Sequence, residues 1–215
     1  MTILALDTTS EFGSLAIRSG AQTASELTLH SPEGFAHLIF PAIERLLEQA
    51  AIRLEQIDCF AAASGPGSFT GVRVGLSAVK GLAEATSKPA VGVSNLQTIS
   101  SFGNLPLRAI VLDARRGEVY AAVYDTNLQP VIPEAVLKLP AWLASLDAPA
   151  YQFISPLGHG ILEGTRFAEM PFIDPPKSLA TAVAYCAEQS PWVDPASLDA
   201  NYVRRSDAEL FWKDA

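Results

Sequence analysis

The sequence has few cysteines, few histidines and little positive charge, and it lacks any long hydrophobic run. Its 215 residues include only two cysteines, Cys59 and Cys186, which lie far apart and without metal-ligand spacing. We expect both to be reduced thiols in a cytoplasmic protein. No apolar stretch reaches the roughly 20 residues that cross a bilayer. Asp7 interrupts the apolar start, which argues against a signal peptide. We therefore expect no membrane association.

The charge balance is acidic, with 15 lysines and arginines against 23 aspartates and glutamates and a net charge of −8. An acidic chain repels phosphate backbones, which disfavours strong nucleic-acid binding by this chain alone. If RNA is involved, a partner is expected to supply the positive surface. The apolar content of 49% and the charged content of 18% are those of a globular protein with one compact unit or two small lobes.

The two halves of the chain share a pattern. "ILALDTTSEFGSLAI" and "AIVLDARRGEVYAAVY" each predict a strand, Leu-Asp, a polar turn and a second strand, with Asp7 and Asp113 half a chain apart. Strands that alternate with helices indicate an α/β fold. We predict two duplicated βββαβα lobes, 1–103 and 104–215, with the final segment, roughly 198–215, as a candidate to pack back on the N-terminal lobe.

Hydrophobic periodicity places the individual elements. It predicts helices at 35–51, 72–85, 141–146 and 178–189, the last with Ser178 as N-cap. It predicts strands at 2–7, 14–18, 24–29, 57–63, 89–93, 108–113, 118–125, 135–139 and 152–155.

The stretch "SGPGSFTGVRVGLSAVKGLA", residues 64–83, is a glycine-rich turn that leads into a helix. Such turns can bring backbone N–H groups and a helix N-terminus onto a phosphate, here through Gly65, Gly67 and Gly71, with Thr70 as the helix cap. No lysine follows Gly71, so the turn is not a Walker loop, and Thr70 stands where a dinucleotide loop needs glycine. Alternatively, Gly71 and Gly75 share a helix face that lets another helix pack closely. The spacing favours this architectural role, and phosphate binding stays open.

The predicted helix at 35–51 has an apolar arc of about 200°, wider than the stripe that faces a core. One side of this arc can pack on the sheet, and the other would face a partner protein. The alternative is a helix buried between two layers. Pro41 either kinks the helix or lies in its first turn. The residues expected at a partner interface are Phe35, Ala36, Phe40, Ile43 and Leu47.

Taken together, "GPGSFTGVRVGLSAVKGLA", "LDARRGEVY" and the opening "ILALDTT" resemble the bacterial TsaB (YeaZ) family, and the likeness runs through to "NYVRRSDAE". The resemblance implies a two-lobed fold related to actin, sugar kinases and Hsp70 (the ASKHA fold). It also implies a non-catalytic subunit in the synthesis of threonylcarbamoyladenosine on tRNA. The implied partners are a TsaD-like catalytic paralogue, contacted through the first helix, and a TsaE-like ATPase. A homodimer could use the same helix, and tRNA would be contacted only indirectly.

The resemblance also bears on chemistry. In the wider superfamily an Asp-x-Gly-Ser/Thr turn helps hold Mg-ATP, whereas here Asp7 and Thr8 lead a turn without glycine. Where the catalytic paralogue has its His-x-x-x-His metal pair, "VGVSNLQTIS" has no histidine or acid. We therefore expect no catalytic residue, metal or cofactor in this chain, with ATP and metal on partner subunits. The weak cleft candidates are Asp7, Thr8, Gly67, Ser68, Asp113 and Arg115.

Several alternatives remain at the sequence level. The same fold could be a small kinase or ATPase that acts in a cleft between Asp7 and Asp113, or a glycoprotease-like peptidase. The turn with Arg115 and Arg116 could bind an anion or pair with its own acids, and His159 is expected in a surface loop.

Overall fold

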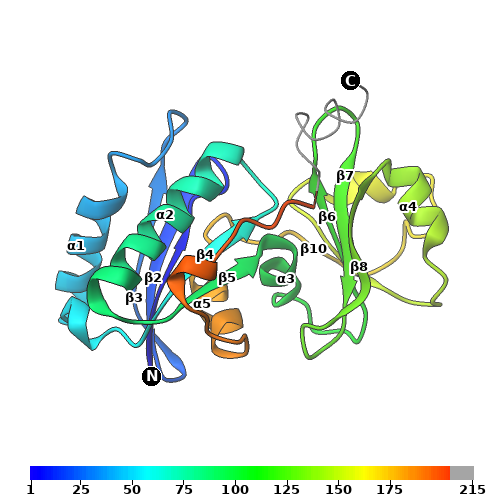
Figure 1. The fold of residues 1–215 in the computed structure, drawn as a ribbon. Coiled ribbons are helices and arrows are strands. Elements are labelled where there is room, and N and C mark those ends of the chain that lie inside the picture. Colours follow the sequence, from blue (N-terminus) through cyan, green and yellow to red (C-terminus); the bar gives the residue numbers. More distant parts are fainter. Residues whose placement is uncertain (204–215) are drawn as a thin grey trace. The chain divides into compact units, whose positions relative to one another are not determined.

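The computed structural model describes residues 1–203 and divides them into two units, each built on its own five-stranded sheet (Figure 1). The first unit contains residues 1–98 and 176–200, and the second contains residues 99–175 and 201–203. Within residues 1–203, no helix combines the length and the hydrophobicity needed to cross a membrane.

The sheet of the first unit has the order β3-β2-β1-β4-β5. β1 pairs antiparallel with β2 and parallel with β4, and the register sets Asp7 opposite Ser14. β1 and β4 are almost entirely buried, as expected for central strands covered on both faces. The strands are β1 (Thr2–Asp7), β2 (Phe12–Ser19), β3 (Gln22–His30), β4 (Cys59–Gly65) and β5 (Ala90–Ser94).

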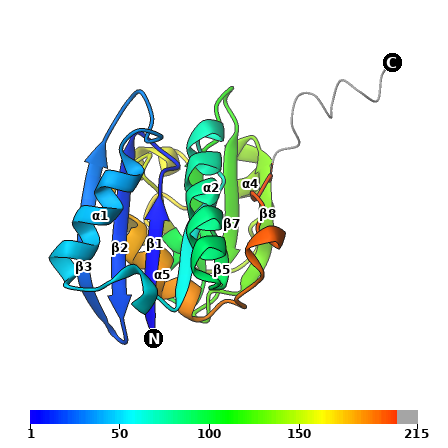
Figure 2. The same cartoon turned by 60° about the vertical axis from the view of Figure 1, so that its left-hand side comes forward.

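Helices cover both faces of this sheet (Figure 2). α1 (Ile39–Ala50) and α2 (Phe69–Thr86) lie over one face and share a core with alternate residues of the strands, such as Leu4 and Phe60. α5 (Ala180–Glu188) packs on the other face against β1 and β2. The unit is completed by η1 (Leu54–Gln56), η3 (Pro195–Ser197) and most of α3 (Asn95–Ser100).

The sheet of the second unit repeats the first. Its order, β8-β7-β6-β9-β10 when written from β8, matches β3-β2-β1-β4-β5, and Asp113 ends β6 as Asp7 ends β1. This repeat confirms the duplicated two-lobed α/β fold that the sequence predicted. The elements are β6 (Arg108–Asp113), β7 (Val119–Tyr124), β8 (Pro130–Leu137), α4 (Leu139–Ser145), β9 (Gln152–Ile154), η2 (His159–Leu162) and β10 (Phe172–Ile173).

The contacts divide the chain differently from the boundary expected between residues 103 and 104. Residues 176–200 return to the first unit because α5 is anchored there, with Arg18 of β2 bonded to Glu188 at 2.8 Å. Leu198 also lies in the first unit's core, whereas the rest of the predicted returning segment, from position 204, lies outside the described residues.

The N-cap predicted at Ser178 is wrong. α5 begins at Ala180, and the hydroxyl of Ser14, on β2, accepts hydrogen bonds from the backbone N–H groups of Leu179 and Ala180 at 3.0 Å. Ser178 instead donates to Glu26. The cap comes from a strand 165 positions earlier in the chain, so local sequence carries no sign of it.

α1 starts four residues later than expected, at Ile39, because the chain before it forms a turn. Pro41 is therefore in the first helical turn, where its missing N–H costs nothing. Phe35 precedes the helix and is 2% exposed. Its ring occupies the space that a side chain at Gly13 would need.

Candidate functional site

Asp7 is buried at the end of β1, with 1% of its surface exposed. Its Oδ1 accepts hydrogen bonds from the backbone N–H and the hydroxyl of Thr9, at 2.9 and 2.6 Å. Its Oδ2 is buried and has no hydrogen-bond partner among the described residues. Burial raises the pKa of the Asp7 carboxyl above its usual value, and the two bonds from Thr9 oppose part of that rise.

Asn95 joins this turn to the end of β4. Its Nδ2 donates to the Thr9 hydroxyl at 2.6 Å, and its Oδ1 accepts from the Gly65 N–H at 3.0 Å. One buried hydrogen-bond network therefore joins the turn after β1, the first residue of α3 and the start of the glycine-rich turn. Sequence reasoning missed Asn95 because it searched that stretch only for metal ligands.

The glycines of the glycine-rich turn pack against Thr8 and Thr9. A side chain at Gly71 would place its Cβ 1.9 Å from the Thr8 carbonyl oxygen, and one at Gly67 would lie 2.7 Å from Thr9. Gly75 faces the Thr8 hydroxyl in the same way, at 2.6 Å. Their common neighbour is therefore the turn after β1, and not another helix as the sequence predicted.

Hydrogen bonds fix the same contact. The Thr8 hydroxyl donates to the Gly71 carbonyl at 2.7 Å, and the Ser68 N–H donates to the Thr9 carbonyl at 2.7 Å. The cap of α2 is Ser68, whose hydroxyl accepts from the Gly71 N–H at 3.2 Å, whereas the sequence suggested Thr70. Two backbone donors that could have faced a phosphate, those of Ser68 and Gly71, are thus bonded within the chain.

Asp113 and Arg115 belong to the second unit, whereas Asp7, Thr8 and the glycine-rich turn belong to the first. The Asp113 carboxylate accepts from the Arg115 N–H at 2.8 Å and lies 3.9 Å from its guanidinium. Both side chains are exposed, Arg115 to 89% and Asp113 to 50%. A shared cleft that uses Asp7 and Asp113 remains a prediction.

The expected interface residues divide between surface and core. Phe40 is half exposed and Ala36 is exposed, while Leu47 is partly buried against the core. Phe35 and Ile43 lie inside, 2% and 3% exposed, so they are corrected from surface to core. The reason is that the inner side of the wide apolar arc packs on the sheet, and Phe35 lies outside the helix.

Phe69 of α2 joins Phe40 at the surface, and sequence reasoning missed it. It is 56% exposed, and the guanidinium of Arg73 lies 3.3 Å from its ring centre. Both phenylalanines line a groove of about 410 Å³ between α1 and α2, together with Val74 and Ala78. The available signal was a large aromatic residue at the first helical position, next to a polar turn.

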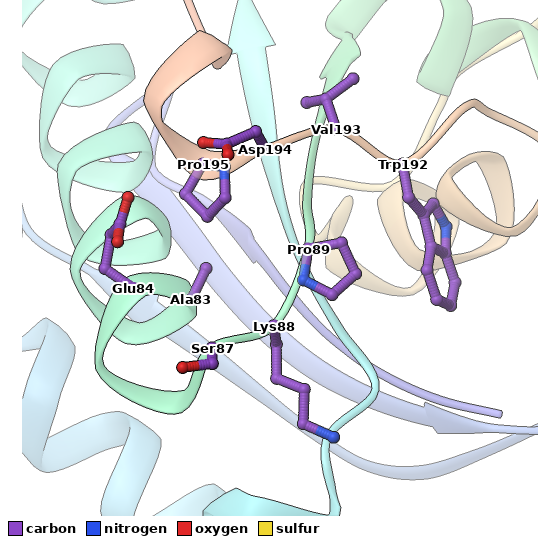
Figure 3. A pocket seen from close by; sticks show the side chains of 9 residues that line it. All are labelled: Ala83, Glu84, Ser87, Lys88, Pro89, Trp192, Val193, Asp194 and Pro195. Atoms are coloured by element: carbon purple, nitrogen blue, oxygen red, sulfur yellow. The ribbon is translucent and has the colours of Figure 1, made fainter.

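A second hollow, of about 500 Å³, lies at the C-terminal end of α2 (Figure 3). Lys88 and Pro89 border it on one side and Trp192 on the other, where the segment after α5 crosses. That segment is bonded to the edge of β5, because Ala90 and Val193 exchange two backbone hydrogen bonds of 3.0 and 2.9 Å. None of the residues predicted from sequence lines this hollow, and its walls serve to close the sheet edge.

The histidines and cysteines are dispersed. His30 stacks on Phe12, and His159 lies edge-on to Phe172. His159 is exposed, as predicted, but it begins the short helix η2 and does not lie in a loop. Both cysteines are buried, and burial raises the pKa of the Cys59 thiol to about 12. In the described part of the chain, no three His, Cys, Asp or Glu residues form a group that could hold a metal ion.

Comparison with known proteins identifies relatives of this chain. The family model for TsaD, tRNA N6-adenosine threonylcarbamoyltransferase, matches residues 30–174. The protein named tRNA threonylcarbamoyladenosine biosynthesis protein TsaB is 32% identical in Bacillus subtilis, over 68% of this chain and 66% of the relative. Its Escherichia coli counterpart is 36% identical, over 64% of this chain and 63% of the relative. These matches thus span slightly less than two thirds of the curated relatives.

The solved structure of YeaZ from Pseudomonas aeruginosa superimposes with a TM-score of 0.79 at 26% identity, over 94% of this chain and 100% of that one. The likeness therefore extends through both units and includes the duplicated sheets. The TsaD family model thus covers more than half of the chain, and together with the named relatives and the YeaZ structure it shows that the chain belongs to the TsaB (YeaZ) family.

Proposed function

We propose that this chain is a non-catalytic scaffold and activator subunit in the synthesis of threonylcarbamoyladenosine on tRNA. It docks on a TsaD-like transferase through α1 and the neighbouring start of α2. The tRNA-modification role follows from the similarity to the TsaB relatives, which are named as threonylcarbamoyladenosine biosynthesis proteins. The observation that carries the docking is the apolar surface on which Phe40 and Phe69 are 50% and 56% exposed.

This surface has the composition of a protein interface. Interface cores are rich in aromatic residues and arginine and poor in other charged residues. Here two phenylalanine rings flank an apolar groove whose one charged lining residue, among those described, is Arg73. A partner helix with an apolar face and an acidic residue opposite Arg73 fits this pattern. A second copy of this chain would use the same surface in a homodimer.

The packing of the glycine-rich turn supports the non-catalytic part of the proposal. A phosphate loop needs free backbone donors and room for close approach. In this chain the space next to Gly71 and Gly67 is already occupied by Thr8 and Thr9. In the proposed complex, ATP and metal belong to the partner subunits, including a TsaE-like ATPase, and tRNA reaches the transferase.

The docking is tested by co-purification with the TsaD-like transferase of the same source, comparing wild type with Phe40→Asp and Phe69→Asp. Each substitution lies in the first turn of its helix, where a negative charge is tolerated, so the fold should persist. Loss of an aromatic interface anchor costs about 2 kcal/mol or more, which is roughly a 30-fold weaker Kd. Ala141→Asp is the matched control, since it adds the same charge at an exposed position in the first turn of α4, in the other unit.

Two results would contradict the proposal. Unchanged affinity of both phenylalanine variants would remove the α1–α2 surface as the docking site. Tight binding of Mg-ATP to the isolated chain, with turnover in calorimetry, would favour the small kinase or ATPase instead. A protease assay on unfolded casein addresses the peptidase alternative, for which we expect no cleavage.

A further inference from the structure

The buried hydrogen-bond network around Thr9 is costly for a protein core. Asp7 is 1% exposed, and its Oδ2 has no hydrogen-bond partner among the described residues. Asn95 is 3% exposed and uses both atoms of its amide group, one on Thr9 and one on Gly65. Buried polar groups cost free energy unless all their partners are present, and apolar residues of the same shape can be equally stable. Stability alone therefore does not account for this network.

The network lies where three parallel strands end. Asp7 ends β1, Gly65 ends β4, and Asn95 directly follows β5. Because β1 pairs parallel with β4, and β4 pairs parallel with β5, these ends share one edge of the sheet. α2 begins at Phe69, four residues after Gly65. The network is thus next to the start of a helix that contributes to the proposed docking surface.

Thr9 connects the network to α2. Its hydroxyl is oriented from two sides, because it donates to Asp7 at 2.6 Å and accepts from Asn95 at 2.6 Å. Its carbonyl accepts from the Ser68 N–H at 2.7 Å. Ser68 is the N-cap of α2 and directly precedes Phe69. The buried network therefore fixes the residue from which the helix starts.

Phe69 depends on this support because it is a surface residue. It is 56% exposed, and it lines the groove between α1 and α2 together with Phe40. An interface residue that is already held in its bound position loses less conformational entropy on association. The residues that touch a partner are placed accurately only when the residues beneath them are fixed by packing and hydrogen bonds.

We propose that Asn95 is a positioning residue for the docking surface. Through the Thr9 hydroxyl it holds the start of α2, and with it Phe69, where the apolar face of the partner's helix binds. The inference rests on the proposed function, because it concerns the same surface, although Asn95 itself is buried and touches no partner. Phe40 lies on α1, which none of these hydrogen bonds reaches, so its contribution to docking should not depend on Asn95.

A double-mutant cycle on the binding of the full chain to the TsaD-like transferase tests the inference. Asn95→Ala is expected to raise the Kd roughly threefold to tenfold. In a Phe69→Ala background the same substitution should change the Kd by less than about twofold, because the side chain that it positions is gone. In a Phe40→Ala background the loss caused by Asn95→Ala should remain in full.

Three further variants separate positioning from stability. Ser14→Ala removes the cap of α5 in the same unit, so it lowers stability without touching the start of α2, and its Kd should be that of wild type. Thr9→Val breaks the link to Asn95 from the other side and replaces Asn95→Ala if that variant does not fold. Thr9→Ser keeps the hydroxyl and should bind within about twofold of wild type. Thermal unfolding shows whether each variant is folded at the temperature of the binding measurement.

A wild-type Kd for Asn95→Ala or, in its place, Thr9→Val would overturn the inference, and so would an equal loss in the Phe69→Ala background. A similar loss in Ser14→Ala would also overturn it, since lower stability would then explain the effect. If Thr9→Ser bound as weakly as Thr9→Val, the hydroxyl would not be the link. If Phe40→Ala and Phe69→Ala both bound like wild type, the proposed docking surface would fail, and this inference with it.

Discussion

Gly71→Ala is predicted to destabilise the first unit strongly, although alanine is the better helix former. The new Cβ would lie 1.9 Å from the Thr8 carbonyl oxygen, whereas real Cβ contacts essentially never fall below 3.0 Å. The turn after β1 would have to retreat by about 1 Å, and the bond from the Thr8 hydroxyl to the Gly71 carbonyl would be distorted.

The magnitude follows from these two effects. Overpacking in a well-packed region costs about 1–3 kcal/mol, and a lost hydrogen bond costs about 0.5–1.5 kcal/mol. The higher helix propensity of alanine offsets at most about 1 kcal/mol of this loss. A net loss of about 0.5–4.5 kcal/mol is expected, which lowers Tm by on the order of 2–4 °C per kcal/mol for a chain of this size.

The control is Gly81→Ala on the same helix. Gly81 is exposed, and a Cβ there would meet no atom within 4 Å, so alanine should stabilise the chain by up to about 1 kcal/mol. Urea and thermal unfolding of both variants would measure the opposite signs. If the unfolding free energy of Gly71→Ala lay within about 0.5 kcal/mol of the wild-type value, Gly71 would not be required for packing. Phosphate binding by this turn would then be an open interpretation again.

Two further predictions concern buried polar groups. For Asp7, burial raises the pKa in the folded state above 3.8, so the folded chain holds the proton more tightly and stability falls as pH rises from about 3.8 through that raised pKa. Asp7→Asn should flatten this part of the curve of unfolding free energy against pH, and an unchanged curve would refute the assigned burial effect. Ser14→Ala removes the hydroxyl that caps α5 and should cost about 1–3 kcal/mol in urea unfolding. Ser178→Ala, at the predicted cap, should stay within about 0.5 kcal/mol of wild type, and equal losses in both would contradict the tertiary cap.

The Asp-turn hairpins show where sequence reasoning succeeds. "ILALDTTSEFGSLAI" and "AIVLDARRGEVYAAVY" each combine two apolar strands with a polar turn between them, and this local pattern is sufficient to place β1, β2, β6 and β7. The repeat of the pattern also predicted the duplicated lobes. The surroundings of the two turns differ, because the glycine-rich turn covers Thr8 and Thr9, whereas the Arg115 side chain is 89% exposed among the described residues.

The apolar arc of α1 shows the limit of sequence reasoning. Periodicity identified a face too wide for one core, but it could not say which side faces inward. Ile43 is buried because it packs into the core that α1 shares with the sheet, whereas Phe40 is 50% exposed. Phe69 completes the surface from another helix, and no local pattern connects it with Phe40.

The sequence by itself determined the strand and helix types, the duplication and the family likeness, because these depend on periodicity, turn residues and motifs read within short windows. Only the tertiary structure decided that α5 returns to the first unit, that Ser14 caps it, and that the glycines serve the Thr8–Thr9 turn. These features depend on contacts between residues 63 to 170 positions apart. Such contacts arise from the packing of whole elements, which no local pattern encodes.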